Sequence, residues 1–89
     1  MQFEGKIVIV TGAAQGIGKC LAETYAQEGA TVVAADINAQ LGKETVDRIS
    51  TNGNNAIFIH TDVANPTDIE LLIKRTVDQF GRIDILINN

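Results

Sequence analysis

The stretch that decides the fold is residues 10–29, VTGAAQGIGKCLAETYAQEG, and within it the eight residues TGAAQGIG at positions 11–18. Three glycines, Gly12, Gly16 and Gly18, separate a run of β-branched residues from a run with helical spacing. Glycine adopts backbone conformations that a side chain obstructs, so this pattern predicts a sharp turn between a strand and a helix.

The residues on either side of the glycines fit this interpretation. Residues 6–10 (KIVIV) form a short continuous apolar run, as expected of a strand that is buried on both faces of a parallel sheet. Beyond the turn, a helical stripe ends at Gly29 and is expected to face the core; its members are Ile17, Leu21, Ala22, Tyr25 and Ala26. Cys20, in the same helix, is expected to be inert packing.

The pattern of strand and helix repeats along the chain. Further strands are predicted at residues 31–35 (TVVAA), 56–60 (AIFIH) and 84–87 (DILI). One helix is predicted to begin after a cap at Asn38, and another after Asn65, with Pro66 in its first turn. The resulting βαβαβαβ order predicts an α/β fold with a parallel sheet covered by helices on both faces.

The handedness of the crossovers predicts the strand order. Right-handed connections place the first two helices on one face and the third helix on the other, which gives the order 3-2-1-4 of a doubly wound sheet. In such a sheet, ligands bind at the carboxyl ends of the strands where the order reverses, between strands 1 and 4. The glycine turn, Asp62-Val63 and Asn88-Asn89 are all expected at that edge.

Composition excludes several classes of function. Seven basic and eleven acidic residues give a net charge of −4, so no basic surface for nucleic acid or an anionic membrane is expected. The single cysteine can form no internal disulfide and no metal site is predicted. The start, MQFEGKIVIV, fits neither a signal peptide nor a spanning helix, which favours a cytoplasmic protein. Eighty-nine residues make one domain at most.

The glycine turn is also suited to a ligand with phosphates. Gly12 allows the turn out of the strand, while Gly16 and Gly18 allow close approach, one by the phosphates and the other by the helix against the sheet. Asp36 ends the second strand, 24 residues after Gly12, close to the spacing at which an acidic side chain accepts hydrogen bonds from the ribose of NAD.

Three motifs resemble those of the short-chain dehydrogenases/reductases. TGAAQGIG at residues 11–18 resembles their TGxxxGxG motif, Asp62-Val63 their adenine-ring motif, and Asn88-Asn89 the first half of their NNAG motif. The resemblance implies a Rossmann fold, with the glycines along the pyrophosphate, Asp62 and Val63 at the adenine, and Asn89 along the adenosine ribose. The cofactor-binding residues expected in total are Gly12, Gln15, Gly16, Ile17, Gly18, Asp36, Ile37, Asp62, Val63 and Asn89.

The resemblance to this family also favours NAD over NADP as the cofactor. In the family that the chain resembles, an arginine or lysine at the position of Gln15, or just after the acidic residue, favours NADP, and this chain has Ile37 at the second position. Asp36 would also repel the additional phosphate of NADP.

The resemblance implies an oxidoreductase that transfers hydride between NAD(H) and an alcohol or carbonyl substrate. The family's catalytic asparagine, serine, tyrosine and lysine would lie after residue 89, so no catalytic residue is predicted within this chain. We expect the chain to be the first part of a single NAD-binding domain, truncated within NNAG, of a protein that forms a homotetramer or homodimer. The alternative is a stand-alone, non-catalytic nucleotide-binding or regulatory module.

Overall fold

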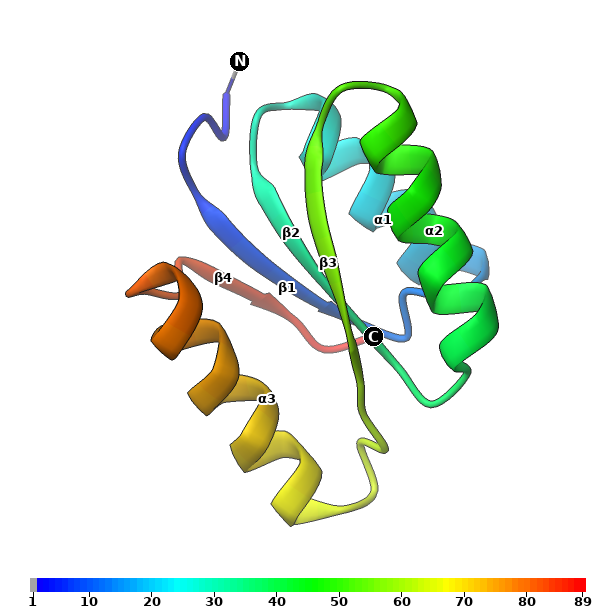
Figure 1. The fold of residues 1–89 in the computed structure, drawn as a ribbon, viewed down its shortest axis with the longest axis vertical. Helices are drawn as coiled ribbons and strands as arrows, with labels where there is room; N and C mark the ends of the chain where they lie inside the picture. The colour runs from blue at the N-terminus through cyan, green and yellow to red at the C-terminus, as the bar shows by residue number, and fades with distance from the viewer. Residues whose placement is uncertain (1) are drawn as a thin grey trace.

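The computed structural model describes residues 2–89. These residues form strands and helices in strict alternation: β1 (Ile7–Thr11), α1 (Gly16–Gln27), β2 (Thr31–Asp36), α2 (Ala39–Thr51), β3 (Asn55–His60), α3 (Pro66–Phe80) and β4 (Ile85–Ile87). The strands are all parallel and lie side by side in the order β3-β2-β1-β4 (Figure 1). The predicted α/β class and strand order are confirmed.

The helices cover both faces of the sheet. Figure 1 shows α1 and α2 on one face and α3 on the other. Alternate residues of each central strand face opposite cores: Val8 and Val10 pack toward α1 and α2, whereas Ile7 and Ile9 pack toward α3. Each such side chain contributes about 1.5–3 kcal/mol when fully buried, which explains why the strands are apolar throughout.

Two helices begin at the predicted caps. The Asn38 side chain accepts a hydrogen bond from the Leu41 N–H at 3.0 Å and starts α2. The Asn65 side chain accepts from the Thr67 N–H at 2.9 Å and starts α3, with Pro66 as its first residue. Such caps satisfy backbone N–H groups that have no partner within the helix.

Two expectations for α1 are wrong. Its buried face consists of Gly18, Ala22 and Ala26, which lets the helix approach the sheet closely. Ile17 is therefore turned out of the core and is 72% exposed. Cys20, two residues from both Gly18 and Ala22, lies on the exposed side of the helix.

The strand predicted at residues 84–87 begins one residue later, at Ile85. Asp84 instead joins β4 to β1 through its side chain, which accepts a hydrogen bond from the Ile7 N–H at 2.8 Å. This backbone hydrogen bond and a second from the Arg82 side chain hold the pKa of Asp84 below its usual range.

Candidate functional site

The three positions of the turn that hold glycine require it for different structural reasons. Gly12 and Gly16 have φ values of 67° and 63°, a conformation that favours glycine. A Cβ on Gly18 would lie 1.9 Å from the Gly12 carbonyl oxygen, so α1 can pack against the turn only with glycine there. A Cβ on Gly16 would meet nothing within 4 Å. Gly18 thus serves packing, and Gly16 faces open space.

The start of α1 differs from the starts of the other two helices in residues 2–89. Gln15 occupies the N-cap position but its side chain makes no capping hydrogen bond, whereas the side chains of Asn38 and Asn65 cap α2 and α3. Like α2, α1 carries no acidic residue in its first turn. The first backbone N–H groups of a helix have no intrahelical acceptor, and the helix dipole makes this end electropositive. The glycine turn therefore presents donors that an anion could bind.

The Asp36 carboxylate is fixed beside this turn. Its Oδ2 accepts a hydrogen bond from the Ala14 N–H at 3.0 Å, and its Oδ1 accepts from the Asn38 N–H at 2.8 Å. The side chain joins the glycine turn to the segment that follows β2. Each carboxylate oxygen can accept more than one hydrogen bond, so Asp36 keeps acceptor capacity for hydroxyl groups of a ligand.

The segment after β3 forms another wall of the site. The Thr61 N–H donates to the Asp36 carbonyl at 3.0 Å, which extends the pairing of β2 and β3 beyond the end of β3. Asp62 is held at both ends: its N–H donates to Asp68 Oδ2 at 2.9 Å, and its Oδ1 accepts from the Ala64 N–H at 2.9 Å. Val63 remains half exposed beside it.

Thr11 ties the ends of β1 and β4 together. Its hydroxyl is placed to donate to the Ile87 carbonyl at 3.3 Å, and it accepts a hydrogen bond from the Asn89 N–H at 3.0 Å. The Asn89 amide lies close to Gly12, since a Cβ on Gly12 would be 2.8 Å from Asn89 Nδ2. The second asparagine is thereby held against the glycine turn.

These segments enclose a pocket of about 150 Å³ at the carboxyl edge of the sheet. Six of its lining residues are among those predicted from the sequence, and they are Gly12, Asp36, Ile37, Asp62, Val63 and Asn89. The other four predicted residues lie on the glycine turn and the first turn of α1, and they are Gln15, Gly16, Ile17 and Gly18.

Sequence reasoning missed Thr11 and Thr61. Both side chains are almost fully buried, and each lies at or just after the carboxyl end of a strand. Thr61 also lines the pocket. A polar residue that immediately follows a buried apolar strand is the signal that could have identified them.

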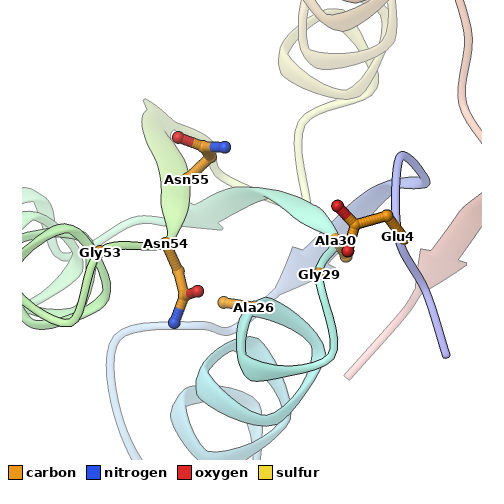
Figure 2. A pocket seen from close by; sticks show the side chains of 7 residues that line it. All are labelled: Glu4, Ala26, Gly29, Ala30, Gly53, Asn54 and Asn55. Atoms are coloured by element: carbon orange, nitrogen blue, oxygen red, sulfur yellow. The ribbon is translucent and has the colours of Figure 1, made fainter. Parts of the chain in front are cut away.

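A second pocket, of about 140 Å³, lies at the opposite edge of the sheet. Figure 2 shows that the side chains of Asn54 and Asn55 point in opposite directions there, and that Glu4 lies apart from both. Polar groups do not converge as they do around Asp36, so this pocket is the weaker candidate for a functional site.

Within residues 2–89, no helix combines the length and the apolar character needed to cross a membrane. The same part of the chain holds no group of three or more His, Cys, Asp or Glu residues that could bind a metal ion.

Comparison with known proteins matches this architecture to one family. The family model described as "short chain dehydrogenase" matches residues 6–89. An uncharacterized oxidoreductase of Thermotoga maritima is 51% identical to the whole of this chain, which covers 35% of that protein. The chain thus spans about a third of the length of the curated relatives it matches.

Solved structures show the same fold. A hydroxysteroid dehydrogenase from Escherichia coli is 39% identical with a TM-score of 0.97, and the match covers 99% of this chain and 37% of that one. A short chain dehydrogenase/reductase from Burkholderia phymatum, solved in complex with NAD, is 32% identical with a TM-score of 0.92. That match covers 97% of this chain and 31% of the Burkholderia chain.

Proposed function

The chain belongs to the short-chain dehydrogenase family, and on that premise we propose that it forms the NAD-binding part of an oxidoreductase. The proposed reaction transfers hydride between NAD(H) and an alcohol or carbonyl substrate. The nicotinamide supplies the hydride chemistry when it is bound. The residues of this chain bind and orient the dinucleotide.

The glycine turn fits a pyrophosphate. The open space above Gly16 and the uncapped N-terminus of α1 offer room and backbone donors at the same place. Gln15 and Ile17 flank this position and are both exposed. A side chain on Gly16 would project into the space that the phosphates need.

The pocket beyond the turn fits an adenosine. Asp36 would accept hydrogen bonds from the ribose hydroxyls, and Ile37 and Asn89 line the same pocket. Asp62 and Val63 would contact the adenine ring from the end of β3.

The observation that carries the choice of NAD is the position of the Asp36 carboxylate, which both Ala14 and Asn38 hold in the pocket wall through backbone N–H groups. An additional phosphate on the adenosine ribose would meet a fixed negative charge there. The family resemblance at Gln15 and Ile37, where no basic side chain is present, points the same way.

Titration calorimetry of the intact gene product with NAD and with NADP tests this function. We expect NAD to bind at least tenfold more tightly, since the repulsion at Asp36 and the missing basic partner both oppose NADP. Tighter binding of NADP would overturn the assignment of Asp36. Failure to bind either dinucleotide would overturn the function itself.

A further inference from the structure

A buried hydroxyl from α2 contacts the glycine turn. Thr45 is 1% exposed, and its Oγ1 lies 3.0 Å from the carbonyl oxygen of Ala13, 32 residues away in the chain. Its own helix offers a second acceptor, the Leu41 carbonyl, at the longer distance of 3.3 Å. The shorter distance assigns the hydroxyl proton to Ala13.

The hydrogen bond from Thr45 adds to two others that hold the backbone of the glycine turn. The Ala13 N–H donates to the Ala35 carbonyl at 3.2 Å, and the Ala14 N–H donates to Asp36 Oδ2 at 3.0 Å. Ala13 and Ala14 are themselves buried. Without Thr45, the Ala13 carbonyl would lose a hydrogen bond in a buried position, which favours a shift of the peptide.

We propose that Thr45 is a positioning residue for dinucleotide recognition, which holds the peptide between Gly12 and Gly16 in the shape that binds the pyrophosphate. This inference rests on the proposed function. Thr45 does not line the pocket, so it acts through the turn. Because Ala14 also donates to Asp36, a shift of this peptide would disturb the pyrophosphate site and the ribose acceptor together.

Thr76 provides a matched control. It is 0% exposed, and its hydroxyl donates at 2.8 Å to the carbonyl of Leu72 within its own helix, α3. Thr45→Val and Thr76→Val therefore remove the same group from buried helical sites and keep nearly the same shape. Only Thr45→Val removes a contact with the glycine turn.

The experiment measures the Kd for NAD by calorimetry on the intact gene product. We expect Thr45→Val to raise the Kd about tenfold, and we expect Thr76→Val to change it less than about twofold. Thr45→Ser keeps the hydroxyl and should restore the affinity to within about twofold of the original. Hydrogen exchange should become faster in residues 12–16 in Thr45→Val alone. Should Thr45→Val not fold, Thr45→Cys, with its weaker donor, is expected to lose affinity in the same direction.

The outcomes separate this inference from the function on which it rests. If the unmodified protein does not bind NAD, the proposed function fails and the role of Thr45 fails with it. If the unmodified protein binds NAD and the two valine variants bind it equally well, the role of Thr45 is overturned while the proposed function stands. An equal loss of affinity in Thr45→Ser and Thr45→Val would also overturn it, because the hydroxyl would then not be the cause.

Discussion

At the scale of single residues, the glycine motif combines two requirements that the sequence pattern does not separate. Gly18 is required by its neighbours, because any side chain there would overlap the Gly12 carbonyl. Gly16 is required by its backbone conformation and, under the proposed function, by the ligand. The two positions should therefore respond differently to substitution by alanine.

Gly16→Ala should weaken NAD binding at least tenfold at a modest cost in stability. Its φ of 63° costs an alanine about 1–2 kcal/mol, but the space around the new Cβ is open. Gly53→Ala is the control, since Gly53 has a φ of 82° and equally open surroundings but lies after α2, outside the pocket. Urea denaturation should give similar losses for both variants, and calorimetry should give a loss of NAD affinity for Gly16→Ala alone. Equal NAD affinities would exclude the phosphate-binding role of this turn.

The double substitution Asp36→Ala with Ile37→Arg should move the preference toward NADP. It removes the repelling carboxylate and adds a guanidinium that can pair with the additional phosphate. Asp36→Ala alone is the control. It should lower the affinity for NAD without raising the affinity for NADP, because no positively charged side chain is present to pair with the additional phosphate. The ratio of NADP to NAD affinity in the double variant should rise about 100-fold or more. An unchanged ratio would contradict the role of Asp36.

At the scale of elements, polar side chains link both ends of β4 to β1. Thr11 joins the carboxyl ends of β1 and β4, and Asp84 joins the start of β4 to the start of β1. The short strand β4 is therefore held at both ends by side chains as well as by its ladder. Because the Ile7 N–H and Arg82 stabilise the charged form of Asp84, this link depends on pH.

The substitution Asp84→Asn should destabilise the protein at neutral pH and flatten its acid sensitivity. The pKa of Asp84 in the folded state is below the unfolded value of about 3.9, so its contribution is complete above that value and is lost as the pH falls through the folded-state pKa. The free energy of unfolding of each protein is measured at pH 7, 5 and 3. The difference between the variant and the original should thus become smaller as the pH falls. Asp78→Asn, on the exposed side of α3, is the control and should cause a smaller loss at pH 7. Parallel curves for Asp84→Asn and the original would show that Asp84 does not carry this pH dependence.

At the scale of the whole molecule, the strand order followed from the sequence because periodicity and chain handedness are local or general properties. The location of the candidate site at the carboxyl edge of the sheet could also be predicted, since parallel strands bring their carboxyl ends together wherever they pair. Contacts between segments that are distant in the sequence could not be predicted, and the hydrogen bond from the Thr45 hydroxyl to the Ala13 carbonyl is the clearest case. The exposure of Ile17 was missed for a related reason: the close packing at Gly18, against Gly12, sets the rotation of α1.

The arrangement of the sheet predicts how the 89-residue chain behaves when it is produced alone. In residues 2–89, β4 pairs with β1 on one side, and the other side is a free strand edge that carries Leu86, which is 51% exposed. Apolar strand edges promote association between copies. We expect sedimentation velocity to show concentration-dependent association at neutral pH, and Leu86→Lys to shift the chain toward monomer, because a charged side chain opposes pairing at the edge. Leu71→Lys changes a residue of α3 with a similar exposure of 50% and should leave the association largely intact. If Leu71→Lys abolished association and Leu86→Lys did not, the exposed side of α3 rather than the strand edge would be the contact between copies.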